Sequence, residues 1–148
     1  MVSIKTTNDK IKVNLEQLKT EAQKVLGLLD YAEFELNIFL TTNQTIRAYN
    51  KKYRKIDKPT DILSFRYWPK AKPDKLIVPL LAQDKQLGDL IISLEYVENQ
   101  LKEFDQTMDE RIRVLVVHGI CHLVGYDHKT EADYKKMKAK EDWLLARI

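Results

Sequence analysis

The chain has 148 residues, of which 44% are hydrophobic and 32% are charged, with a net charge of +3. These values suit one folded domain over residues 1–148 and exclude a disordered chain. No apolar run approaches the ~20 residues that span a bilayer, and the N-terminal residues lack a signal-peptide core. We therefore expect no membrane segment and a cytoplasmic protein, in which the single cysteine, Cys121, forms no internal disulfide.

The apolar pattern divides the first half of the chain into short elements. The predicted elements are strand or lead-in segments at 2–5 and 10–13, a helix over 15–29, a strand over 34–40, a short helix through residue 53, a turn at 57–60 and a strand over 62–67. Asn14 and Asn43 are expected to cap the two helices, because an asparagine side chain accepts a hydrogen bond from the free N–H groups of a first turn.

The second half carries longer helices. The predicted elements are an exposed loop over 68–86, a buried strand over 88–93, and helices over 94–104, 108–124 and 130–147. Thr107 and Glu110 have the spacing of a capping box, and Thr130 can cap the last helix. The helix over 108–124 is apolar nearly all round, so we expect it in the centre of the domain. Together these elements predict an α+β fold, a small mixed β-sheet packed with helices.

All three histidines lie within one eleven-residue run, at His118, His122 and His128. A spacing of four places His118 and His122 on one face of a helix, and Gly125 allows the chain reversal that returns His128 to the same point. Three imidazoles leave the fourth position of a tetrahedral site open, which is typical of catalytic rather than structural zinc. The run predicts a metal site carried by a buried, zincin-like helix.

Two residues close to these histidines limit which reactions and which metal ligands the site can have. In the H-E-x-x-H helix of metalloproteases a glutamate follows the first histidine and serves as general base. Here that position holds Gly119, which disfavours a peptidase. Cys121 could be a fourth ligand, but a cysteine on a buried helix is more often a small apolar filler.

Glu141 interrupts an apolar stripe of the last helix, formed by Tyr134, Met137, Leu144 and Ile148. A carboxylate on such a face requires a partner, for which an arginine or the free ring N–H of a metal-bound histidine is suitable. A position at the edge of the stripe, in water, explains the residue equally well. Both interpretations stay open on the sequence.

Positive charge is concentrated in residues 47–75, which hold ten Lys or Arg against three Asp, a net of +7. Five aromatic residues lie among these cations: Tyr49, Tyr53, Phe65, Tyr67 and Trp68. Basic and aromatic side chains together suit phosphate contacts and base stacking. The alternative is a solvated helix face followed by a lysine-rich loop.

The run His118-Gly-Ile-Cys-His122-Leu-Val-Gly125-Tyr-Asp127-His128 closely resembles the signature H-G-x-x-H-L-x-G-Y-D-H of the YbeY family, which comprises bacterial metal-dependent endoribonucleases of ribosomal RNA maturation. Residues 50–65 are similar to the family's N-x-x-Y-R…D-x-x-T-D-V-L-S-F, and residues 87–93 to its G-D-I-x-I-S strand. An M-x-x-x-E pattern ending at Glu141 also matches. The resemblance covers residues 34–145.

Two departures accompany the match. Cys121 stands where the family usually has leucine, and the loop 68–86 is longer and richer in lysine. The first is conservative for packing, and the second concerns the surface that faces the substrate.

The resemblance implies one zinc ion per chain, held by His118, His122 and His128, and a functional arginine at Arg54 beside it. The remaining candidate site residues are Asp127 and Glu141 as supports of the metal ligands, and Lys51, Lys52, Lys55, Lys58 and Arg66 as RNA contacts. The resemblance also implies a compact α+β domain, processing of small-subunit ribosomal RNA near its 3′ end, and ribosome quality control. RNA, the ribosome and small-subunit ribosomal proteins are the expected partners.

In the predicted reaction, Arg54 grips the non-bridging phosphate oxygens with its planar guanidinium. The sequence does not decide whether the nucleophile is a metal-activated water or the RNA 2′-hydroxyl. Two other functions are weighed against this one. A metallohydrolase of peptides or small molecules is disfavoured by Gly119 and by the basic segment. A non-catalytic ribosome-binding factor with structural zinc is disfavoured by the open three-histidine site.

Overall fold

A four-stranded mixed sheet runs through the structure, a computed structural model that describes residues 1–148. Its strands are β1 (Val2–Thr6), β2 (Glu35–Thr41), β3 (Ile62–Arg66) and β4 (Gln86–Ser93), in the order β1-β2-β4-β3. β1, β2 and β4 are parallel, and β3 is antiparallel to β4. Parallel neighbours need crossover connections, and α1 (Leu15–Leu28) forms the one between β1 and β2. The predicted α+β fold with a mixed sheet is confirmed.

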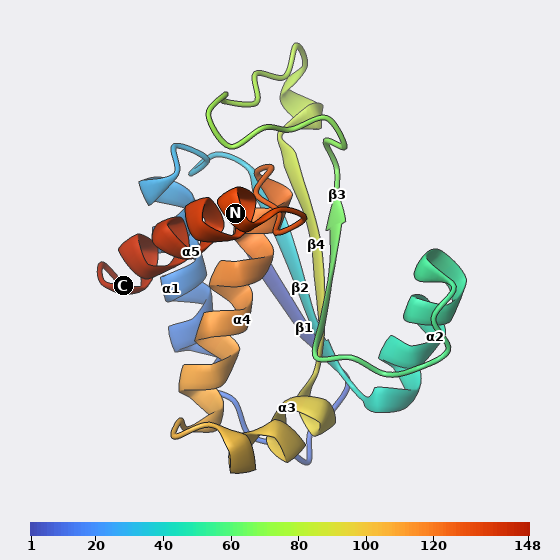
Figure 1. The fold of residues 1–148 in the computed structure, drawn as a ribbon. Helices are drawn as coiled ribbons and strands as arrows, with labels where there is room; N and C mark the ends of the chain where they lie inside the picture. The colour runs from blue at the N-terminus through green and yellow to red at the C-terminus, as the bar shows by residue number, and fades with distance from the viewer.

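Helices cover the two faces of the sheet unequally (Figure 1). α1 and α4 (Met108–Leu123) lie against one face, and α5 (Glu131–Leu145) packs on α4. α2 (Asn43–Arg54) stands on the other side of the sheet. α3 (Leu94–Gln100) and the 3₁₀ turn η2 (Leu101–Glu103) lead from β4 to α4, and η1 (Ala82–Asp84) precedes β4. None of these helices combines the length and the apolar character that a membrane crossing requires.

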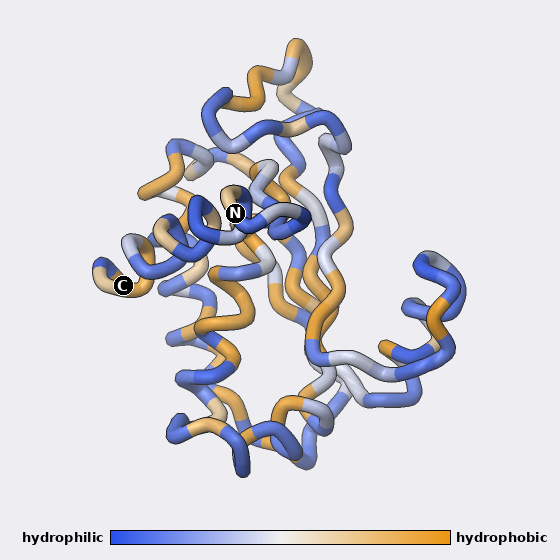
Figure 2. Tube along the Cα trace, viewed as in Figure 1, coloured by the Kyte–Doolittle hydropathy of each residue, from blue (hydrophilic) through white to orange (hydrophobic).

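The main core lies between the sheet, α1 and α4. Alternate residues of β2, namely Leu36, Ile38 and Leu40, are at most 1% exposed and point into it. α4 contributes Ile112 and Ile120, which are both fully buried. Burial of each such side chain stabilises the fold by ~1.5–3 kcal/mol. Figure 2 shows apolar residues along the strands and α4, whereas α2 is mostly hydrophilic. The predicted central place of α4 is thus confirmed.

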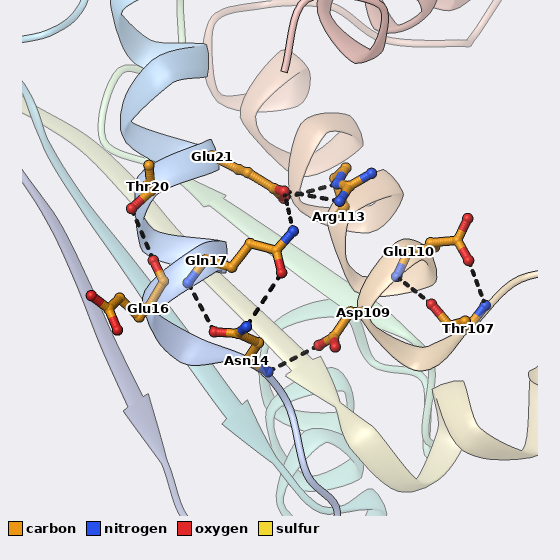
Figure 3. A network of polar contacts seen from close by, with 9 residues as sticks. All are labelled: Asn14, Glu16, Gln17, Thr20, Glu21, Thr107, Asp109, Glu110 and Arg113. Atoms are coloured by element: carbon orange, nitrogen blue, oxygen red, sulfur yellow. Dashed lines mark hydrogen bonds and ion pairs between the residues drawn. The ribbon is translucent and has the colours of Figure 1, made fainter.

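A polar network holds the first half of α4 to α1 (Figure 3). Arg113 donates two hydrogen bonds to the carboxylate of Glu21 on α1, at 2.8 and 2.9 Å. Asp109 accepts the backbone N–H of Asn14 at 2.9 Å, and the predicted capping box is present at the start of the helix. These contacts set where α4 lies along the sheet, and hence where its C-terminal histidines lie.

Local structure decides one open prediction and differs from the predictions elsewhere. Residues 10–13, predicted as a strand or a lead-in, are a lead-in segment without strand pairing. The N-cap of α2 is Thr42 and not Asn43, because the Thr42 hydroxyl accepts the N–H of Thr45 and Asn43 is already helical. The helix predicted over 94–104 ends at Gln100 and continues as a 3₁₀ turn.

Candidate metal centre

The three histidines come together at the C-terminal end of α4. His118 and His122 lie one turn apart, and their Nε2 atoms are 3.1 Å from each other. Gly125 then turns the chain with a φ of +113°, and a Cβ there would lie 2.7 Å from the backbone of Lys72. The following loop returns His128, so that one ring nitrogen of each histidine lies within 4.8 Å of the other two. The structure therefore brings all three candidate ligands to one point.

The outer nitrogens of two rings have acceptor partners. His118 Nδ1 lies 2.8 Å from Glu141 Oε1 on α5, and His122 Nδ1 lies 3.0 Å from the carbonyl oxygen of Tyr126. Because both partners accept hydrogen bonds, each Nδ1 carries the proton and each Nε2 presents a lone pair. Two lone pairs that face each other at 3.1 Å call for a cation between them. This donor set fits a divalent metal ion such as zinc.

The surroundings keep the His122 ring in the neutral state that a metal requires. Burial, reinforced by the neighbouring His118, lowers the pKa of His122 to about 4, so its ring is neutral near pH 7. Glu141 is only 13% exposed at its side chain. Of its two interpretations, the structure therefore shows the histidine partner and not the residue in water.

Two small residues of α4 set the packing around the histidines. A Cβ at Gly119 would lie 2.6 Å from Leu90 Cδ2, so the glycine lets the helix approach β4 closely. A glutamate at this position, as in metalloproteases, would require the Leu90 and Ile62 side chains to shift. Cys121 is fully buried in the core, outside the converging ligand atoms, and burial raises the pKa of its thiol to about 12. The apolar-filler interpretation describes it.

The open side of the histidine cluster faces a cleft of about 670 Å³. Arg54, at the end of α2, and Arg66, at the end of β3, line this cleft together with the three histidines. Arg66 Nη2 also donates to the Tyr126 carbonyl at 3.1 Å, the same oxygen that His122 Nδ1 contacts. Arg66 thus places a positive charge in the cleft and braces the loop that carries His128.

The other candidate residues neither line the cleft nor form a hydrogen bond with a histidine. The candidate RNA contacts Lys51, Lys52, Lys55 and Lys58 are exposed and do not line the cleft. The Asp127 carboxylate accepts the backbone N–H of Lys129 at 3.2 Å, and no histidine is among its hydrogen-bond partners. The structure therefore does not bring Asp127 to an imidazole.

One residue of the site was not singled out from the sequence. Asp61 lines the cleft and also a second cavity of about 450 Å³, and in both it lies with His118 and His128. Its Oδ1 accepts the N–H of Ile62 at 2.7 Å, which holds the carboxylate at the start of β3. The T-D-I-L-S-F stretch that contains it was the available signal.

Known proteins resemble the chain over nearly its whole length. The family model described as Endoribonuclease YbeY matches residues 3–148. Proteins named Endoribonuclease YbeY from Sulfurihydrogenibium sp. (strain YO3AOP1) and Aquifex aeolicus (strain VF5) are 38% and 36% identical, over 97% and 94% of this chain and 95% and 87% of their own. A human protein of that name is 32% identical over 93% of this chain and 82% of its own.

A solved structure shares the fold. The solution structure of TM1509 from Thermotoga maritima superposes with a TM-score of 0.60 at 24% identity, covering 99% of this chain and 91% of that chain. The matching family model, the relatives above 30% identity and the three-histidine centre lead to one conclusion: the chain belongs to the YbeY endoribonuclease family.

Proposed function

We propose that this chain is a zinc-dependent endoribonuclease that cleaves single-stranded RNA. The observation that carries the proposal is the presence, in one cleft, of three converging imidazoles and the guanidinium of Arg54. The names of the relatives support the reaction class. The sequence motifs support a narrower role in the cytoplasm: maturation of small-subunit ribosomal RNA at its 3′ end and ribosome quality control, with small-subunit ribosomal proteins as partners.

The metal centre and Arg54 have distinct physical tasks in this reaction. A divalent ion held by His118, His122 and His128 would supply Lewis acidity to the reaction. Glu141 and the Tyr126 carbonyl hold two imidazoles with their Nε2 lone pairs directed inward. Arg54 donates two parallel hydrogen bonds to non-bridging phosphate oxygens, and its charge stabilises the negative charge that develops during cleavage.

The two other functions have less support. A peptidase of the H-E-x-x-H type needs a glutamate at position 119, where even a Cβ would lie 2.6 Å from Leu90 Cδ2. A structural zinc site needs four protein ligands, and Cys121 lies in the core away from the histidine cluster.

A cleavage assay tests the proposal. A 5′-labelled RNA that spans the 3′ region of small-subunit ribosomal RNA is compared with a scrambled single strand and a duplex of equal length. We expect the wild-type protein to cut single strands internally and the ribosomal strand in preference, while His128→Ala cuts neither. Intact RNA after incubation with the zinc-loaded wild type would contradict the endoribonuclease function, and equal rates on both single strands would contradict the ribosomal role.

A further inference from the structure

The face of the sheet that points away from α1 and α4 is only partly covered. α2 packs there on β3 and β4 (Figure 1). Strand register places the side chains of this face in two rows: Lys5, Phe39, Ile91 and Leu63 in one, and Ser3, Asn37, Asp89 and Phe65 in the other. The face therefore mixes aromatic rings with a few polar groups.

A groove of about 610 Å³ lies between α2 and this face. Its volume is in the ~300–1,000 Å³ range of pockets that enclose small molecules. Tyr49 and Tyr53 of α2 line it with their rings nearly parallel, and the Phe65 ring stands edge-on to Tyr53 with centroids 5.3 Å apart. Tyr53 is 54% exposed, so an aromatic face is available to a ligand.

The groove lies beside the cleft of the metal centre. Tyr53 and Phe65 line both hollows, and Arg54 follows Tyr53 directly in the chain. A strand whose phosphate lies at Arg54 therefore has its neighbouring bases at the entrance of the groove. The shared aromatic pair therefore separates the groove from the metal cleft by no more than these two side chains.

The polar groups of the groove suit a nucleobase. Asn37 Nδ2 donates to Asp89 Oδ1 at 2.9 Å, which leaves amide and carboxylate oxygens that accept hydrogen bonds from the amino groups of bases. The Lys5 ammonium lies 5.5 Å from the centroid of the Phe39 ring and can contact a phosphate. Asp89 is the only acidic residue among those that line the groove.

We propose that the groove between α2 and the sheet binds unstacked bases of the RNA strand next to the phosphate that is cleaved. The identity of the ligand rests on the proposed function. Aromatic faces bind single strands by stacking with little regard to sequence, and exposed sheet faces with aromatic residues are a recurrent way of doing so. The Asp89 carboxylate adds a preference for bases with an exocyclic amino group.

Fluorescence of 2-aminopurine tests the groove without any need for cleavage. A short single-stranded RNA carries the fluorophore at each position in turn and is titrated with the full-length protein in EDTA. We expect quenching at one or two adjacent positions, because the base stacks on the exposed face of Tyr53. Tyr53→Leu keeps apolar bulk but removes the ring, so quenching should be lost and binding should weaken about 5- to 150-fold.

Two variants serve as controls. Tyr53→Trp should restore quenching and affinity, which a merely misfolded groove would not allow. Trp143→Ala removes an aromatic residue that is 37% exposed on α5, on the opposite face, and should leave both readouts unchanged.

Equal quenching in wild type and Tyr53→Leu, or bound RNA without quenching at any position, would overturn the proposal. These outcomes are expected if the groove binds a partner protein instead of RNA. If the proposed function itself is wrong, the cleavage assay shows this separately, because the zinc-loaded wild type then does not cleave RNA.

Discussion

Replacement of Glu141 tests how the metal centre is held. Glu141 Oε1 lies 2.8 Å from His118 Nδ1, and the two side chains are 13% and 29% exposed. A hydrogen bond to a charged group contributes ~1.5–3 kcal/mol. Loss of such a partner from a metal-bound histidine lowers metal affinity by about 10- to 100-fold. Glu141→Gln keeps an acceptor oxygen but loses the charge, so we expect about tenfold weaker zinc binding; Glu141→Ala loses both and should approach 100-fold.

Competition with a chromophoric zinc chelator near neutral pH measures these affinities. Asp142→Asn is the matched control, because Asp142 is the next residue, is exposed and pairs with Lys138 at 2.7 Å. Removal of its charge should leave zinc affinity unchanged. If Glu141→Gln and Glu141→Ala both bind zinc as tightly as the wild type, Glu141 does not support the metal ligand.

Three further outcomes are expected elsewhere in the chain. Arg54→Ala should keep its zinc and its melting temperature while single-turnover cleavage falls ~10²–10³-fold, and Arg54→Lys should also be impaired; a wild-type rate would remove Arg54 from the reaction. Charge reversal at Lys51, Lys52 and Lys55 should flatten the salt dependence of RNA affinity, by about 0.7 in log–log slope per lost phosphate contact, and an unchanged slope would place the RNA elsewhere. Cys121, whose thiol pKa burial raises to about 12, should react with a thiol reagent only after unfolding; rapid labelling of the native protein would contradict its place in the core.

Local signals explain which parts of the fold could be predicted from the sequence. The caps Asn14, Thr107 and Thr130 all accept an N–H of their first turn as expected, because a cap depends only on adjacent residues. The prediction that Asn43 caps α2 was wrong, again because of an adjacent residue. Thr42 beside it is also a capping residue, and the helix begins one residue earlier.

Contacts between elements that are far apart in the chain could not be predicted from such local patterns. The convergence of the histidines followed from their spacing and from Gly125, but the partner of Glu141 depends on how α5 is rotated against α4. The place of Arg54 in the cleft was expected from the family resemblance alone. The groove depends on the sheet order β1-β2-β4-β3, which sets α2 over β3 and β4 on the far face, and no local pattern encodes that order.

Titration of metal-free protein with zinc, followed by cleavage of a labelled single-stranded RNA, tests the central claim most directly. The three-histidine centre predicts no cleavage after chelation. It also predicts a cleavage rate that rises linearly with added zinc and levels off at one zinc per chain. His118→Ala should stay inactive at every ratio, because it loses the imidazole that Glu141 orients. Cleavage by the chelated protein, or wild-type activity of His118→Ala, would contradict a metal-dependent reaction at this site.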